Sequence, residues 1–140
     1  MYVYAIYRDN KTKITMKKLL IILLSIITLT TYSQTWTAGD MNGVYHDISN
    51  HTNKAVLVDI SAHWCGPCWT WHSTHIMQDF YHDFGPNGTD EFMVYWLDGD
   101  AGSSVSILNG AGSSQGDWVT GIDYPIIGPN GEGANVASNY

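Results

Sequence analysis

Cationic side chains are almost absent from most of this chain. Five of its six lysines and arginines precede position 19, and Lys54 is the only one that follows. From Gln34 onward, twelve acidic residues accompany this single lysine, which leaves a formal charge of −11. A surface of this sign repels phosphate backbones and anionic lipid headgroups. Nucleic acid is therefore not expected as a partner.

The sequence also lacks a hydrophobic run long enough to cross a membrane. The longest candidate is Leu19 to Leu29, eleven mostly apolar residues interrupted by Ser25 and Thr28. A bilayer core of about 30 Å needs about 20 apolar residues in a helix. We therefore expect no stable membrane insertion once this segment is removed.

The same run has the flanks of a signal peptide spanning residues 16–33. Met16-Lys17-Lys18 supplies a basic start, and Thr31 and Ser33 place small residues before a cut at Gln34. We expect an exported protein, periplasmic or secreted, in a compartment where disulfides persist. An uncleaved anchor or a buried helix is the alternative. No cysteine follows the run, which argues against a lipoprotein anchor, and residues 1–15 suggest a start codon placed too early.

Only two cysteines occur in the chain, and they are two residues apart, in Trp64-Cys65-Gly66-Pro67-Cys68. An apolar stretch, Ala55–Ser61, precedes them and a helical pattern follows. This order places Cys65 at a helix N-terminus, where free N–H groups and the helix dipole favour a thiolate. A structural disulfide or a zinc half-site is the alternative. A bridge that closes so short a loop would restrict the unfolded chain only slightly.

Two strands and one helix are expected around this motif. Ala55–Ser61 is typical of a strand buried on both faces, and Phe92–Leu97 is a second, aromatic and β-branched strand. Between them no strong helix breaker occurs from Gly66 to about Phe84, because a proline is tolerated in a first helical turn. The pattern predicts a parallel pair joined by a right-handed crossover. The three- and four-residue spacing of Trp69, His72, Ile76, Phe80 and Phe84 suits an amphipathic helix.

The flanking segments give weaker patterns. Asp40 is placed to cap a helix that runs to about Ser49. In the Gly/Ser-rich stretch 99–116, only Val105–Leu108 favours a turn or two of helix. Tyr124-Pro125 leads into a short strand, and a hairpin turn at residues 129–133 would return the chain along residues 134–138. We expect a single domain spanning residues 34–140.

The segment from Val58 to Cys68 resembles the active-site segment of the thioredoxin family, with Trp-Cys-Gly-Pro-Cys intact. Asp59, six residues before Cys65, matches the family's buried aspartate, and Tyr124-Pro125 resembles its cis-proline loop. The resemblance implies an α/β fold, a thioredoxin-like three-layer sandwich with a mixed central sheet. Only fifteen residues follow Pro125, so the family's final helix is expected to be missing and the chain to be C-terminally truncated.

The resemblance also implies the roles of the site residues. Cys65 would be the nucleophile, Cys68 the resolving thiol, and Asp59 the base that takes the proton of Cys68. Contact with the substrate is expected from Trp64, Gly66, Pro67, Tyr124 and Pro125. The expected activity is thiol–disulfide exchange with protein substrates in the cell envelope. We expect no bound cofactor, electrons from an upstream redox protein, and a monomer.

Departures from the family pattern bear on the partner. Trp69 stands where the family usually has a basic residue, and Ser73 stands where a proline kinks the active-site helix. The second strand lacks the lysine often found near the buried aspartate. Together with the acidic surface, these differences make the usual cytosolic reductase an unexpected partner.

The histidines suggest a rival function, a metal carrier that binds through Cys65, Cys68, His72 and His75. A zinc finger separates its cysteine and histidine pairs by about a dozen residues, and this spacing is much shorter. We therefore expect these histidines on a solvated helix face and no metal site. His63, beside the motif, either supports a thiolate when protonated or is a plain surface residue.

Overall fold

The computed structural model describes residues 35–140. The expected signal peptide, residues 16–33, lies outside this range and stays a prediction. Within residues 35–140, no helix is long and apolar enough to span a bilayer.

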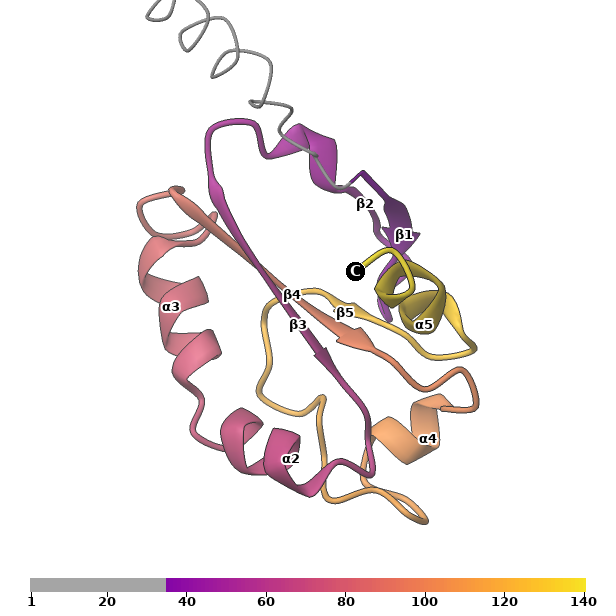
Figure 1. Ribbon diagram of the computed structural model, residues 1–140. Helices are drawn as coiled ribbons and strands as arrows, with labels where there is room; N and C mark the ends of the chain where they lie inside the picture. The colour runs from indigo at the N-terminus through magenta and orange to yellow at the C-terminus, as the bar shows by residue number, and fades with distance from the viewer. Residues whose placement is uncertain (1–34) are drawn as a thin grey trace, which may run out of the picture. The chain divides into compact units, whose positions relative to one another are not determined.

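A three-stranded parallel sheet forms the centre of the domain (Figure 1). Its strands are β3 (Ala55–Ser61), β4 (Phe92–Asp98) and β5 (Ile126–Ile127), in the order β3-β4-β5. The predicted parallel pair is confirmed, with Ala55 opposite Phe92 and Ser61 opposite Asp98. The described sheet is parallel throughout, whereas a mixed sheet was expected.

The fully buried strand is β4, and β3 lies at the edge of the described sheet. Residues 93–98 are all buried, while most of β3 is only partly covered and Ile60 is 42% exposed. The prediction that Ala55–Ser61 is buried on both faces is therefore wrong. An apolar run identifies a strand, but strand order depends on pairings distant in sequence.

Two helices, and not one, cover the first face of the sheet. They are α2 (Gly66–His72) and α3 (Ile76–Phe84), separated by His75, whose backbone is left-handed with φ 58°. This conformation ends the helical hydrogen-bond run, so the predicted continuous helix is wrong in its middle. Both helices pack with the loop residue Trp118 over Val94 and Trp96 of β4.

The second face is covered by a hairpin and a C-terminal helix. The hairpin pairs β1 (Thr37–Gly39) with β2 (Tyr45–Asp47) and leads into a 3-10 turn, η2 (Ile48–Asn50). The predicted helix from Asp40 is wrong, because the Asp40 carboxylate accepts the N–H groups of Asn42 and Val44 and so fixes a turn.

Helix α5 (Glu132–Ala137) replaces the predicted returning strand and completes the third layer. Asn130 and Gly131 have φ of 65° and 85°, which turns the chain into this helix and not into a hairpin. Gly133 seats α5 against the sheet, since a Cβ there would lie 2.2 Å from the Ile127 carbonyl oxygen. The expectation that no helix follows the last strand is therefore wrong. The short helix α4 (Val105–Leu108) forms as predicted.

Candidate redox site

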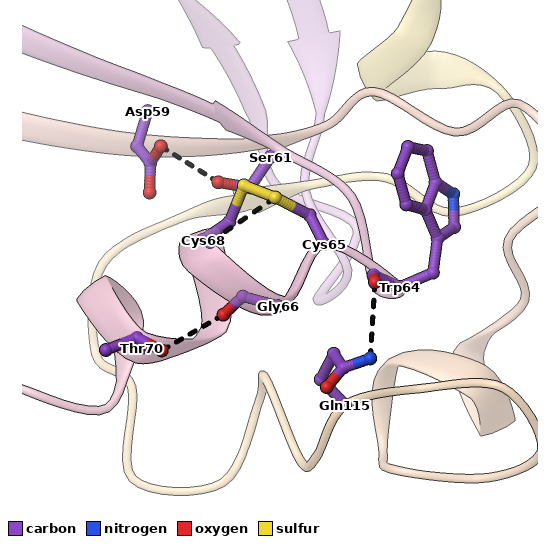
Figure 2. The surroundings of a disulfide bond; sticks show 8 residues. All are labelled: Asp59, Ser61, Trp64, Cys65, Gly66, Cys68, Thr70 and Gln115. Atoms are coloured by element: carbon purple, nitrogen blue, oxygen red, sulfur yellow. Dashed lines mark hydrogen bonds between the residues drawn. A yellow bond between two sulfur atoms is a disulfide. The ribbon is translucent and has the colours of Figure 1, made fainter.

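The motif cysteines form a disulfide where β3 passes into α2 (Figure 2). The chain turns after Ser61 through a hydrogen bond from the Cys65 N–H to the Ala62 carbonyl. Cys65 is the N-cap of α2, and its Sγ accepts the Cys68 N–H at 3.3 Å. Pro67 fits the first turn because no intrahelical partner is needed there. Reduction would leave Sγ of Cys65 beside a backbone donor that favours its thiolate.

Asp59 lies on β3 near the disulfide, and the Ser61 hydroxyl lies between the two in the view of Figure 2. It is opposite Trp96 in the parallel register, and Trp96 packs on the α2 face, so both side chains point toward α2. The Ser61 hydroxyl donates to one Asp59 oxygen at 3.0 Å, while the other oxygen is buried and has no partner within the described part of the chain. Burial raises the pKa of Asp59, and the Ser61 hydrogen bond only partly opposes it. This carboxyl group can therefore hold a proton more readily than a solvated one.

A segment of the Gly/Ser stretch forms a wall beside the motif. The Gln115 N–H donates to the His63 carbonyl at 2.9 Å, and its side-chain amide donates to the Trp64 carbonyl at 3.3 Å. The Trp64 indole is 57% exposed and donates to Asp100 at 2.8 Å. No pattern in the sequence signalled these contacts, since they join residues 36 to 52 positions apart.

His63 is buried and not a surface residue. One ring nitrogen lies 2.9 Å from the Ser103 hydroxyl and the other 3.3 Å from the Ser113 hydroxyl. Both of its ring nitrogens are thus engaged by the loop that follows β4. The side chain joins this loop to the start of the motif, and the plain surface interpretation is wrong.

Tyr124 and Pro125 lead into β5, which does not pair with the strand that carries the motif. Strand β5 pairs with β4, which separates it from β3, and the Pro125 carbonyl accepts the Trp96 N–H at 3.1 Å. Residues 35–140 contain no cis peptide bond, so the predicted cis proline is wrong here, in line with the general trans preference of X–Pro bonds. Tyr124 is buried in the core cluster that Cys68 borders, and burial with the Asp59 charge raises its pKa.

The two helix histidines do not join the cysteines. His72 is buried against the rings of Trp69 and Trp118, at centroid distances of 5.6 and 4.8 Å, so the predicted solvated position is wrong for it. His75 is exposed, as predicted, at the break between α2 and α3. Among residues 35–140, no group of three or more potential metal ligands is gathered in one place.

We expect His72 to make the fold sensitive to acid. Burial lowers its pKa from 6.5 to about 4, so it is neutral when folded and protonates more easily when unfolded. The contribution of neutral His72 to the free energy of unfolding is therefore complete above pH 6.5. It is lost as the pH falls toward 4, and the whole loss is about 3 kcal/mol. Denaturant unfolding between pH 7 and 4 measures this loss.

The matched variants are His72→Phe and His75→Asn. Phenylalanine fits an aromatic site in which the imidazole Nδ1 has no partner among residues 35–140, and it should remove most of the acid sensitivity. Asparagine tolerates the left-handed backbone of position 75 and should leave the pH profile unchanged. An unaltered profile in His72→Phe would contradict this assignment.

The chain has a thioredoxin-like α/β fold with a Cys-Gly-Pro-Cys disulfide at its strand–helix junction. It is similar to the solution structure of a proposed protein disulfide isomerase from Bacteroides thetaiotaomicron, with 22% identity and a TM-score of 0.56. That match covers 76% of this chain and 59% of the other. A proposed thiol:disulfide interchange protein, DsbE from Chlorobium tepidum, matches with 22% identity, a TM-score of 0.43 and coverages of 74% and 65%. No family model and no curated protein matches the chain.

Proposed function

We propose that this protein is a thiol–disulfide oxidoreductase that acts through Cys65 and Cys68. The observation that carries the proposal is the position of Asp59 near this disulfide (Figure 2), with one buried carboxyl oxygen that has no partner among residues 35–140. A structural bridge gains little from closing a two-residue loop and has no use for a buried acid beside it. An exchange reaction needs a reactive thiolate and a group that holds a proton, and Cys65 at the start of α2 and Asp59 would supply them.

In the reducing direction, the Cys65 thiolate attacks a substrate disulfide. A mixed disulfide forms and one substrate sulfur leaves as a thiolate. Cys68 then loses its proton to Asp59 and attacks Sγ of Cys65, which releases the second substrate thiolate and re-forms the Cys65–Cys68 disulfide. Two electrons pass from protein to substrate. The reverse sequence oxidises a dithiol, and no step requires a bound cofactor.

The proposed setting is the cell envelope or the exterior. The basic, apolar and small-residue pattern of residues 16–33 supports export, and residues 34–140 would form the mature domain. Its substrates would be protein thiols and disulfides, with electrons exchanged through an upstream redox protein. Trp69 and Ser73 replace the basic residue and the proline that the thioredoxin family usually has at these positions. This difference supports a partner other than the usual cytosolic reductase.

The test is the reduction potential of the pair. The protein is equilibrated in glutathione buffers of graded poise, and mass spectrometry reads the fraction of Cys65 and Cys68 that is alkylated. We expect a single two-electron transition. A midpoint near about −270 mV assigns a reductase and one near about −120 mV an oxidant. If no poise produces or removes the intramolecular disulfide, the proposal is refuted.

A further inference from the structure

The strand that leads into the disulfide has one open edge within the described structure. In the order β3-β4-β5, only one side of β3 is paired. Figure 1 draws β3 across the front of the domain, between the α2–α3 layer and the α5 layer, with no element in front of it. In such a position a strand presents free backbone donors and acceptors to another chain.

The direction of each backbone group on β3 follows from its pairing with β4. The Ala55 N–H donates to Glu91 and the Ser61 carbonyl accepts from Gly99, so odd-numbered residues face β4. Because successive residues alternate, the N–H and carbonyl groups of Val56, Val58 and Ile60 face outward. None of these six groups has a partner among residues 35–140.

This edge runs directly to the cysteines. Ser61 ends β3 and Cys65 begins the motif only four residues later. Ile60 and Trp64 expose 42% and 57% of their surfaces, which leaves apolar contacts beside the edge and beside the disulfide. A segment paired with β3 would therefore be held along the path that ends at Cys65.

The negative charge of the domain favours another polypeptide over a second copy of this chain as the occupant of the β3 edge. Each copy carries −11 over residues 34–140, so pairing two copies would bring large like charges together. On this edge the one lysine of the domain, Lys54, is already paired with Asp90. A cationic segment is attracted by the same field that opposes self-association.

We propose that the β3 edge binds the substrate as an extended, cationic, cysteine-containing segment, which adds a strand to the sheet and brings its sulfur to Cys65. The inference rests on the proposed function and names its substrate class. Backbone hydrogen bonds supply affinity in this mode, and side chains on alternate positions supply selectivity. It places substrate pairing on β3, whereas the sequence predicted substrate contact at Tyr124 and Pro125, which precede β5 on the other side of β4.

The experiment uses a short synthetic peptide of lysine and valine around one cysteine, which is joined as a mixed disulfide to a chromogenic thiol. The reduced Cys65 attacks the peptide sulfur and the chromogenic thiolate leaves. Cys68 then attacks Cys65, and the peptide thiol is released. Dithiothreitol, present as the reductant, reduces the Cys65–Cys68 disulfide back to the dithiol and is itself oxidised. The release of the chromogenic thiolate gives kcat/KM.

Two N-methylated peptides test the pairing. One is methylated on every second backbone amide and the other on the remaining amides, so only one of them loses the hydrogen bonds to Val56, Val58 and Ile60. Loss of two bonds or more should lower kcat/KM by at least about tenfold for that peptide alone. The second peptide is the matched control for the effect of methylation on the free chain. Raising the salt concentration should weaken the reaction of the lysine peptide.

Bis(2-hydroxyethyl) disulfide has no peptide groups and cannot pair with a strand. Its reduction therefore tests the proposed function without testing this inference. If this compound is reduced and the two methylated peptides react alike, strand pairing is overturned while the oxidoreductase stands. If neither it nor any peptide is reduced, both proposals are overturned. Sedimentation adds a third outcome: a stable dimer with equal reaction of both peptides means that a second copy occupies the edge, which also overturns the proposal.

Discussion

Cys65→Ser should abolish thiol–disulfide exchange, with the rate falling to the background of the uncatalysed reaction. A serine hydroxyl is a far weaker nucleophile than a thiolate at neutral pH, and the Cys68 N–H that favours the Cys65 thiolate would bond to a neutral oxygen. The reduction of bis(2-hydroxyethyl) disulfide by dithiothreitol measures the effect. Loss of the bridge should change stability only slightly, because it closes so short a loop.

Cys68→Ser is the matched variant for this prediction. It keeps the attacking thiolate and removes the resolving one, so the mixed disulfide with substrate should accumulate and be visible by mass spectrometry. If Cys65→Ser retained the activity of the unmodified protein, or if Cys68→Ser were the one unable to form the mixed disulfide, the assignment of the two roles would be wrong.

The parts of the fold predicted correctly are those with strong local signals. Ala55–Ser61 and Phe92–Leu97 are apolar runs bounded by turns, and the structure extends the second only to Asp98. The motif between them fixes where the helix begins. The position of Asp59 near the cysteines was predictable for the same reason. Asp59 lies on the strand that positions the cysteines, so its side chain has a fixed relation to them.

The errors arise where a few hydrogen bonds override a pattern. The Asp40 carboxylate could cap a helix or close a turn, and its bonds to Asn42 and Val44 select the turn. The left-handed backbone of His75 divides a continuous helical pattern, which sequence periodicity does not register. Residues 130 and 131 likewise suit either a hairpin or the entry to a helix.

The remaining errors are tertiary. Whether β5 pairs with β3 or with β4 depends on contacts across some thirty to seventy residues, and no local feature of Tyr124-Pro125 records the choice. The burial of His63 depends in the same way on Ser103 and Ser113, which reach it from a loop with few sequence signals. Such contacts can be read only from the folded chain.

Asp59→Asn should slow the release of substrate while making the fold more stable. Because burial raises the pKa of Asp59, the charged form is disfavoured in the folded state. Stability is therefore lost as the pH rises from 3.8 through the raised pKa, and a neutral amide avoids this loss at pH 7. Removing a positioned proton acceptor should meanwhile slow the Cys68 step by about 100-fold.

The two steps can be followed separately. Stopped-flow mixing of the reduced variant with the chromogenic peptide disulfide should show unchanged attack by Cys65, because Asp59 takes no part in it, followed by slow resolution by Cys68. The resolution rate of the unmodified protein should rise with pH through the ionisation of Asp59, and the Asn variant should lack that rise. Urea unfolding at pH 7 gives the change in stability.

The control is Asp79→Asn, which removes the same charge from an exposed site on α3. It should leave resolution unchanged, so a general effect of reducing the acidic charge would appear in both variants. Slower resolution together with lower stability in Asp59→Asn would indicate a structural carboxylate. Removing a disfavoured buried charge cannot lower the stability of the fold. Slower release of substrate together with greater stability is therefore the result that identifies Asp59 as the proton acceptor.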